Sequence, residues 1–504
     1  MTAHVPSAAL PPTDERRRRI ALYVLCAGML MIVLDVTVVN VALPSIQSDL
    51  GFSGSSLAWV VNAYLISFGG LLLLAGRFGD LLGHRRMFLA GLVVFTSASM
   101  ACGLAGSQAT LVGARFVQGV GGAMTSAVIL GMIVTMFPEP RAQAKAIGVY
   151  GFVASAGGSI GLLAGGVLTQ AIDWHWIFFI NVPIGIITAT LALRLIEPGH
   201  GVGLDQGADV PGALLLVTSL MLGVYTIVVP AARHGWGAGE TLGLGATSLA
   251  LLGGFLVREA TAARPLIPLR VFRSRDLAGA NLIQALLVAG MFGMFFLGAL
   301  YLQRVLHYDA LTIGLAFLPT TLVMGTMSLR YSEPLVMRFG PRRVLIAGMA
   351  LGALGLGWFA QVPVHDAYVV HVLPALVVLG LGIGGSFPAL MALAMTGAGP
   401  QDAGLASGLV NTTAQVGGAL GLAVLATVAS THSNGLIHHG TSTASALTAG
   451  YHLAFWIGAG LVVVAIATAV FVLESATARA PAGVAAGESR RLDEIPAGTC
   501  TEVG

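Results

Sequence analysis

The sequence consists largely of apolar stretches about twenty residues long, separated by short polar connections. A helix of that length crosses the hydrocarbon core of a bilayer. We predict fourteen such spans, at 20–42, 58–76, 87–106, 110–136, 145–171, 176–196, 210–229, 240–257, 278–303, 312–330, 343–361, 368–395, 403–430 and 451–473. Because 56% of the residues are hydrophobic and only 9% are charged, little sequence remains for a water-exposed surface. We therefore expect an all-α integral membrane protein.

Three short sequences from the first half recur in the second half, in the same order and at nearly the same separation. They are GHRR (83–86) and GPRR (340–343), VQGVGG ending at Gly122 and GLGIGG ending at Gly385, and GGSIGL (157–162) and GGALGL (417–422). This repetition predicts two six-helix bundles, at 20–196 and 278–473, with two inserted transmembrane helices in the linker 197–277. Parallel repeats of this kind place a substrate cavity between them near the middle of the membrane and permit alternating access.

The basic residues are distributed unevenly among the connections. Arg115 falls inside a span, only Arg233 and Arg304 fall on the second side of the membrane, and the others lie on the first side or in the tails. Basic residues concentrate on the cytoplasmic side of membrane proteins. We therefore expect a multi-pass protein of the plasma membrane with both termini in the cytoplasm. The tails would be a cytoplasmic N-tail at 1–19 and a disordered cytoplasmic C-tail at 474–504.

Two charged residues, Asp35 and Arg115, lie inside predicted spans. A charge there costs about 2.5 to 3.5 kcal/mol on insertion scales, so each needs a reason to be present. A carboxylate in apolar surroundings can load a proton on one side of the membrane and release it on the other. Arg115, Gln118 and Gly122 share one helical face that can approach Asp35. We predict that Asp35 and Arg115 couple transport to protons; a buried ion pair that only joins helices is the alternative.

Amide and bulky apolar side chains within the spans are the candidates for substrate binding. They are Asn40, Asn62, Gln118, Asn281, Gln284, Met291, Phe292, Phe295, Asn411 and Gln415. The alternative for the amides is that they pair with one another between helices. Since no acid lies in the spans 278–303 and 312–330, we expect substrates that are monocationic, zwitterionic or neutral.

The connection 76–86, GRFGDLLGHRR, combines glycines with one acid and three arginines. We predict a gating loop in which Asp80 forms ion pairs and a helix-end contact in one conformation and loses them in another. Its residues are Gly76, Arg77, Gly79, Asp80, Gly83, Arg85 and Arg86. Gly157, Gly161 and Gly165 recur every four residues and predict a helix-packing motif, which would serve close packing, helix sliding or both.

Several other functions are excluded or disfavoured. The few scattered basic residues do not form a nucleic-acid surface. Lys145, the only lysine, follows Ala144, so the chain has no P-loop. It also has no HExxH motif and no convincing nucleophile elbow, so we do not expect an enzyme. His432, His438 and His439 are better explained as solvated loop residues than as metal ligands, and we expect neither metal nor cofactor.

The motifs together resemble those of a known family. They are LDVTVVNVALPSI, GRFGDLLGHRR, RFVQGVGGAM, GGSIGLLAGG and WHWIFFINVPIGI. They are similar to the fourteen-span drug:proton antiporters of the major facilitator superfamily. The resemblance implies efflux of lipophilic drugs or antibiotics, driven by inward proton flow. We expect the protein to function as a monomer. It implies coupling by Asp35 and Arg115, with Asp80 and Arg85 in the gating loop.

Two positions depart from the family pattern. Leu162 stands where the family has proline after glycine, which puts the associated helix bend in doubt, and His175 stands where it usually has arginine. A histidine, unlike an arginine, loses its charge near neutral pH. A proton-coupled transporter of a metabolite would need the same fold and the same acid, so it remains the alternative function.

Overall fold

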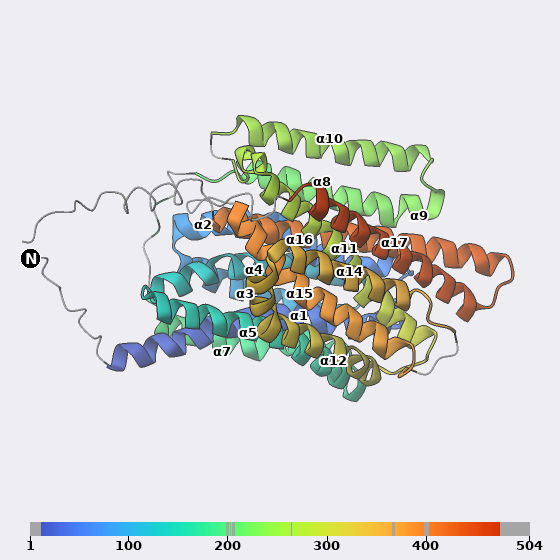
Figure 1. Ribbon diagram of the computed structural model, residues 1–504, viewed down its shortest axis with the longest axis horizontal. Helices are drawn as coiled ribbons and strands as arrows, with labels where there is room; N and C mark the ends of the chain where they lie inside the picture. Colours follow the sequence, from blue (N-terminus) through green and yellow to red (C-terminus); the bar gives the residue numbers. More distant parts are fainter. Residues whose placement is uncertain are drawn as a thin grey trace, which may run out of the picture.

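The structure is a computed structural model that describes residues 12–197, 201, 203, 207–263, 265–364, 368–397 and 403–473. These residues form helices and connections, with no β-strand among them (Figure 1). The helices are α1 (Pro12–Leu50), α2 (Trp59–Leu82), α3 (His84–Gly103), α4 (Gln108–Met136), α5 (Pro140–Ala171), α6 (Trp176–Phe179), α7 (Asn181–Leu195), α8 (Val210–Val228), α9 (Pro230–His234), α10 (Gly239–Thr261), α11 (Arg275–Arg304), α12 (Ala310–Thr326), α13 (Ser332–Phe339), α14 (Pro341–Phe359), α15 (Val372–Gly397), α16 (Ala403–His438) and α17 (Thr443–Phe471).

Thirteen helices in the described part of the chain are long and apolar enough to cross a membrane. They include α8 and α10, which correspond to the predicted inserted spans 210–229 and 240–257. The predicted span 145–171 lies within α5, a continuous helix of 32 residues that is not among these thirteen. The chain is therefore a multi-pass, all-helical membrane protein.

The first helix is longer than the predicted span 20–42. It begins at Pro12, a residue type whose fixed φ suits the first helical turn, so residues 12–19 are helical and are not an extended tail. It continues through Pro44 to Leu50. The rest of the predicted N-tail, residues 1–11, and the predicted C-tail 474–504 lie outside the described residues.

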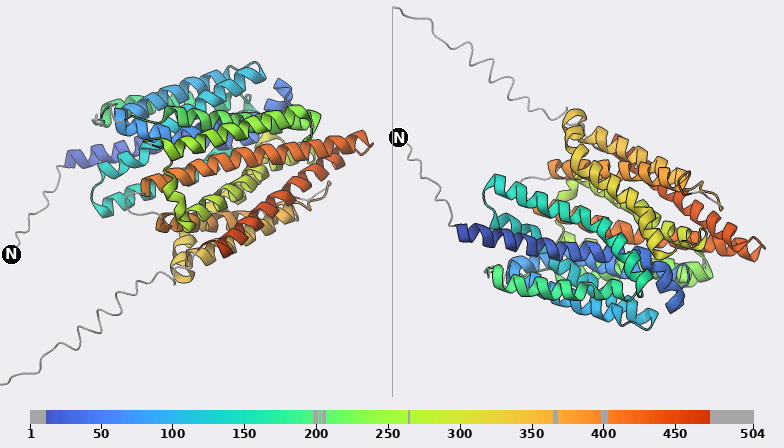
Figure 2. Two further views of the ribbon diagram at one scale, coloured as in Figure 1. Left: turned by 90° about the horizontal axis from the view of Figure 1, so that it is seen from above. Right: turned by 90° about the horizontal axis from the view of Figure 1, so that it is seen from below.

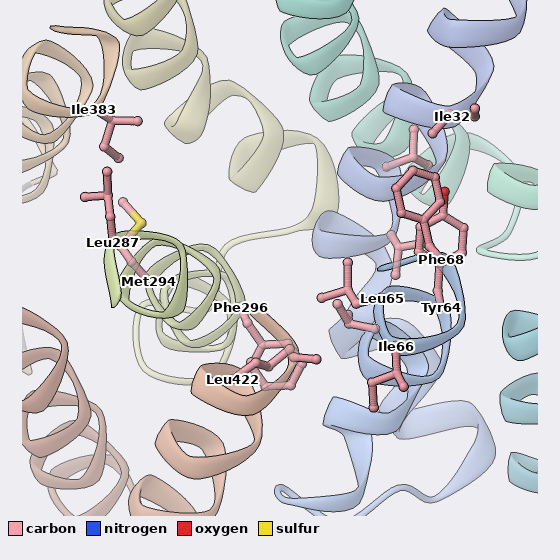
Figure 3. Packing of buried hydrophobic residues seen from close by; sticks show 14 of the residues in the cluster. Ile32, Tyr64, Leu65, Ile66, Phe68, Leu287, Met294, Phe296, Ile383 and Leu422 are labelled. Carbon is pink, nitrogen blue, oxygen red and sulfur yellow. The ribbon is translucent and has the colours of Figure 1, made fainter. Parts of the chain in front are cut away.

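Helices α1–α7, the first helix group, and α11–α17, the second helix group, pack internally in the same pattern. The contacts of α3 with α4, α2 with α4, α1 with α5 and α1 with α7 correspond to those of α14 with α15, α12 with α15, α11 with α16 and α11 with α17. Between the groups, α5 packs on α12 and α2 packs on α16. The two groups lie side by side in both views of Figure 2. Figure 3 shows buried apolar side chains in each, including Phe68 on α2 and Met294 on α11.

The predicted gating loop is almost entirely helical. α2 continues to Leu82 and α3 begins at His84, so Gly83 alone connects them. Gly83 has φ of 99°, and Gly340, between α13 and α14, has φ of 83°. Only glycine adopts such a backbone readily, which is why one residue can reverse the chain here. The expectation of an eleven-residue loop was therefore wrong.

Helices α8 and α10 form the insert. α8 packs on α2 and α16, and α10 packs mainly on α8, which places the pair along one side of the molecule (Figure 1). The contact is close, because a Cβ on Gly70 of α2 would lie 2.7 Å from Val217 of α8. The Thr427 hydroxyl also donates a hydrogen bond to the carbonyl of Ile227 at 3.3 Å. The insert thus covers the seam between α2 and α16.

Two cavities lie at the two ends of the helices. We call the end at which α1 begins the amino-terminal face, and the other end the opposite face. The amino-terminal cavity, of about 780 Å³, is lined by α1, α2, α4, α5 and α16 together with residues 207–209, 265 and 266. The opposite cavity, of about 950 Å³, is lined by residues 51–56 and by the ends of helices from both groups and from the insert. The lining of each therefore includes residues of both helix groups.

Candidate proton-coupling site

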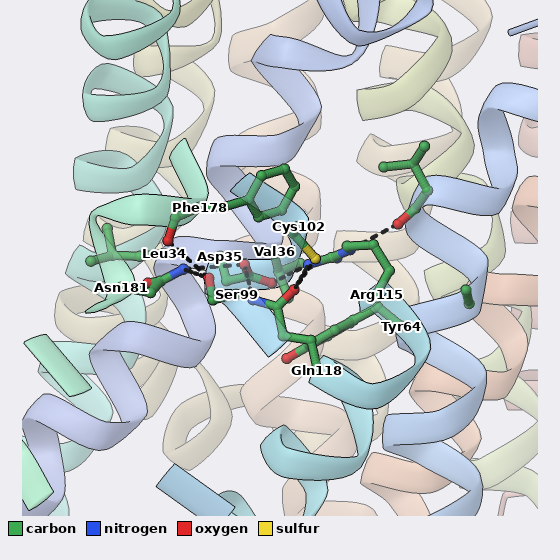
Figure 4. A network of polar contacts seen from close by, with 12 residues as sticks. Leu34, Asp35, Val36, Tyr64, Ser99, Cys102, Arg115, Gln118, Phe178 and Asn181 are labelled. Carbon is green, nitrogen blue, oxygen red and sulfur yellow. Dashed lines mark hydrogen bonds and ion pairs between the residues drawn. The ribbon is translucent and has the colours of Figure 1, made fainter. Parts of the chain in front are cut away.

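A buried polar network surrounds Asp35 inside the first helix group (Figure 4). The Asp35 side chain, on α1, is 1% exposed. Its Oδ2 accepts a hydrogen bond from Arg115 Nη1 at 2.5 Å, and its Oδ1 accepts one from Gln118 Nε2 at 2.7 Å. Asn181 of α7 donates to the same Oδ1 at 3.3 Å. The carboxylate thus connects α1 to α4 and α7.

Arg115 is held on several sides. Its Nε donates to the carbonyl oxygen of Val60 at 2.9 Å, and its Nη1 also donates to Gln118 Oε1 at 2.8 Å. The guanidinium carbon lies 4.4 Å from the centre of the Tyr64 ring and 5.8 Å from that of Phe178. Aromatic faces stabilise a cation that has left water. Ion pairing, hydrogen bonds and π contacts together offset the desolvation of this charge.

A second layer of polar groups orients the first. Asn181 also donates to the Ser99 hydroxyl at 3.1 Å, and Ser99 donates to the carbonyl of Phe178 at 2.9 Å. The thiol of Cys102 donates to Gln118 Oε1 at 3.5 Å. Sequence reasoning missed Asn181, Ser99 and Tyr64. Asn181 could have been found, since it is an amide inside WHWIFFINVPIGI; Ser99 gave no comparable signal.

The shared helical face predicted on α4 explains why Arg115 and Gln118 reach the same carboxylate. The two residues are three positions apart, which places them one above the other on a helix. The start of α4 is defined by a capping box in which Ser107 and Thr110 satisfy each other's backbone N–H groups. The rotation of α4 then directs both side chains at α1.

The two sides of α1 have different neighbours. Asp35 points into the first helix group, whereas Val36 and Thr37, the next residues, line the amino-terminal cavity. Asp35 is therefore not part of the lining of the amino-terminal cavity. Which side of α1 the acid occupies depends on helix rotation, which one sequence does not determine.

The glycine motif of α5 faces α1 around Asp35. A Cβ on Gly157 would lie 3.1 Å from Val33, one on Gly161 would meet the Thr37 hydroxyl, and one on Gly165 would lie 2.9 Å from the carbonyl oxygen of Val38. The three glycines therefore allow the two helices to approach closely. α1 is held between the polar network on one side and α5 on the other.

Gly165→Leu is expected to destabilise the protein by about 1 to 3 kcal/mol, because the new side chain meets the α1 backbone, which cannot move aside cheaply. The shift in the midpoint of thermal unfolding of the purified protein measures this. Gly158→Leu, on the same helix, is the matched control, since a Cβ there meets nothing within 4 Å. Equal effects of the two substitutions would contradict the close approach of α1 and α5.

The predicted substrate-binding residues are dispersed in this structure. Asn411 and Gln415 line the amino-terminal cavity, and the other eight candidates lie outside the lining of both cavities. Gln118 belongs to the Asp35 network. Asn281 accepts a hydrogen bond from the hydroxyl of Thr413 on α16 at 2.8 Å, so it bonds between helices, although not to another amide. Asn62 is fully buried, and its amide has no hydrogen-bond partner among the described residues.

The residues of the predicted gating loop lie at the amino-terminal face. Asp80 of α2 contacts the ring of His84, the first residue of α3, at 3.1 Å, and both side chains line the amino-terminal cavity with Arg77. Arg77 donates to the carbonyl of Gly207 at 3.4 Å. Arg85 donates to the carbonyl of Leu193 at 2.5 Å, close to the end of α7. The partner described for Asp80 is thus a histidine, where the sequence suggested arginines.

The second group contains the counterpart of the Arg85 contact. Arg342, at the second copy of the motif, donates to the carbonyl of Ala469 at 3.0 Å, close to the end of α17. Cationic groups are favourable at helix carboxyl ends. The two copies therefore use corresponding arginines to bind the ends of corresponding helices.

The two departures from the family pattern have defined surroundings. Leu162 is buried within α5, which is helical on both sides of it. His175 contacts the Asp173 carboxylate through its ring and its backbone N–H. Burial raises the pKa of Asp173, but these hydrogen bonds and the histidine charge outweigh it, so the pKa lies below the usual aspartate value. The Trp174 ring stacks on His175 and donates to Asp49 at 3.0 Å.

Comparison with known proteins identifies relatives along nearly the whole chain. The puromycin resistance protein pur8 of Streptomyces alboniger is 38% identical over 479 residues, 94% of each chain. The cephamycin export protein CmcT of Amycolatopsis lactamdurans is 40% identical over 471 residues, 92% of this chain and 94% of the relative. The tetracenomycin C resistance and export protein of Streptomyces glaucescens is 34% identical, covering 84% and 77%.

The fold has solved counterparts. A bacterial homolog of the human lysosomal transporter Spinster, in an inward-facing and occupied conformation, superposes with a TM-score of 0.64 at 15% identity, covering 90% of this chain and 96% of that one. The human organic anion transporter MFSD10 superposes with a TM-score of 0.59 at 16% identity, covering 91% and 100%. The sequence profile described as Major Facilitator Superfamily matches residues 25–422. The chain therefore belongs to the Major Facilitator Superfamily.

Proposed function

We propose that this protein is a proton-coupled antiporter that exports an amphipathic drug or a natural-product antibiotic by alternating access. The observation that carries the proposal is the Asp35–Arg115 ion pair, which lies buried within an apolar bundle next to the cavity-lining side of α1. The arrangement we propose has fourteen spans, in two six-helix bundles plus the two-helix insert. It has both termini in the cytoplasm, so the amino-terminal face is cytoplasmic.

The geometry suggests how protons and substrate are coupled. While Asp35 is ionised, its bonds to Arg115, Gln118 and Asn181 hold α1 against α4 and α7. Protonation removes the charge that these donors stabilise, so the bonds weaken and α1 becomes free to shift. Val36 and Thr37 move with it, because they lie on the same helical turn, and the cavity changes shape. Substrate in the cavity and a proton on Asp35 would thus favour different positions of α1.

The class of substrate is suggested by the relatives, whose names refer to puromycin, cephamycin and tetracenomycin C. Two relatives are named as export proteins, and their similarity covers 92% and 84% of this chain. Export of an antibiotic is therefore the first choice. Transport of a metabolite by the same mechanism remains the second, because Asp35 would serve either cargo equally well.

The direct test uses everted membrane vesicles, whose exposed surface is the cytoplasmic one. Antibiotics of the three named types and a panel of sugars and organic acids are added outside, and their accumulation is followed with the proton gradient present or collapsed by a protonophore. We expect gradient-dependent accumulation of at least one antibiotic and of no metabolite. Accumulation of a metabolite alone would overturn the antibiotic assignment, and accumulation that ignores the protonophore would overturn proton coupling.

A further inference from the structure

Two arginines that the proposed mechanism does not use line the same cavity at the opposite face. Arg233 belongs to α9 and Arg304 to the last turn of α11, yet both line the opposite cavity. They are the two basic residues that the sequence places across the membrane from the others. No Asp or Glu lines this cavity, and neither guanidinium has an acidic partner within salt-bridge distance among the described residues.

Side chains with hydroxyl groups line the same cavity as the two arginines. Tyr451, which is 3% exposed, lines the cavity together with Arg304. Ser433 also lines the cavity, and its Oγ is packed against Gly450 of α17.

The rest of the lining suits the apolar part of a ligand. Trp59 of α2 and Tyr225 of α8 present aromatic side chains to the same cavity. Guanidinium groups bind carboxylate, sulfonate and phosphate oxygens through paired hydrogen bonds, and aromatic rings cover apolar surface. The lining of the cavity thus combines two cationic side chains with aromatic ones.

We propose that the opposite cavity binds an amphipathic organic anion or zwitterion, with Arg233 and Arg304 holding its anionic group. The amino-terminal cavity, by contrast, has two acids, Asp80 and Asp209, and one arginine, Arg77, in its lining. The difference in charge between the cavities favours an anionic group at the opposite face. That this is the release side for the exported compound rests on the proposed function, whereas the binding itself does not. Among the substrates expected from the sequence, a zwitterion satisfies this site.

Binding is tested on the purified full-length protein in a neutral detergent with two fluorescent probes. Anilinonaphthalene sulfonate carries an anionic group, and phenylnaphthylamine has a similar aromatic body without it. We expect Arg304→Gln to weaken binding of the sulfonate about tenfold and Arg233→Gln/Arg304→Gln to weaken it further, because charge-assisted bonds are lost. Binding of the neutral probe should change little. Arg16→Gln, which removes an exposed arginine from α1, is the matched control.

Two outcomes would overturn the proposal. Unchanged affinity for the sulfonate in the double variant would show that the arginines bind no anion. The second outcome concerns nanodiscs, in which the sulfonate probe could bind the wild type in neutral lipid but be displaced by anionic lipid. If the double variant shows no such displacement, the site binds a lipid headgroup, and its assignment to an exported compound is overturned. No transport occurs in detergent, so loss of the proposed anion binding can be distinguished from failure of proton-coupled export.

Discussion

Replacement of Asp35 by asparagine is expected to abolish gradient-driven accumulation in everted vesicles, to the level of vesicles that lack the protein. The asparagine amide keeps the size of the carboxyl group but binds no proton in the physiological range. The proton gradient therefore cannot drive transport through this residue. Its carbonyl oxygen can still accept from Gln118 and Asn181, as Asp35 Oδ1 does now. Arg115 loses its anionic partner, so the variant should unfold at a lower temperature than the wild type, while the folded protein should still bind substrate.

The decisive measurement separates binding and exchange from uphill transport. Asp35→Asn protein should bind the substrate with nearly wild-type affinity and exchange labelled for unlabelled substrate without a gradient. Asp309→Asn is the matched control, since Asp309 caps α12 by accepting from the Thr312 N–H at 2.7 Å and asparagine caps helices about as well. If Asp35→Asn protein still accumulates substrate against a gradient, Asp35 is structural and the proton path lies elsewhere.

Replacement of Arg115 by methionine is expected to lower the free energy of unfolding by about 3 to 5 kcal/mol, because it leaves a buried carboxylate without its cation. Arg115 is 1% exposed, so water cannot readily take over its role. The double variant Asp35→Asn/Arg115→Met removes both charges and should be more stable than Arg115→Met alone. The midpoints of thermal unfolding of the purified variants, measured in one detergent, give their order of stability. Neither variant should transport substrate.

The same comparison tests whether Asp35 and Arg115 stabilise the fold through each other. Loss of stability in Arg115→Met with recovery in the double variant shows that the charges compensate each other. A double variant less stable than the single one would mean that Arg115 acts mainly through Val60, Tyr64 and Phe178 and not through Asp35. Arg16→Met, an exposed change on α1, should leave the unfolding midpoint unchanged.

Several features followed from the sequence because they depend on local physical chemistry. An apolar run of about twenty residues predicts a membrane helix whatever surrounds it, so both inserted spans were found despite their glycine-rich flanks. A charge within such a run needs compensation, which indicated Asp35 and Arg115 before their contact was known. Residues three or four apart share a helical face, which placed Gln118 with Arg115 and aligned Gly157, Gly161 and Gly165.

Other features depended on how the helices rotate and pack against one another, and only the tertiary structure decided them. Asp35 faces α4 and α7 while Val36 and Thr37 face the cavity, because glycines on α5 determine the approach to α1. Asn181 reaches Asp35 from a helix distant in sequence, and Arg233 and Arg304 line one cavity from separate elements. One sequence shows which residues are costly to bury, but their partners depend on the packing of the whole chain.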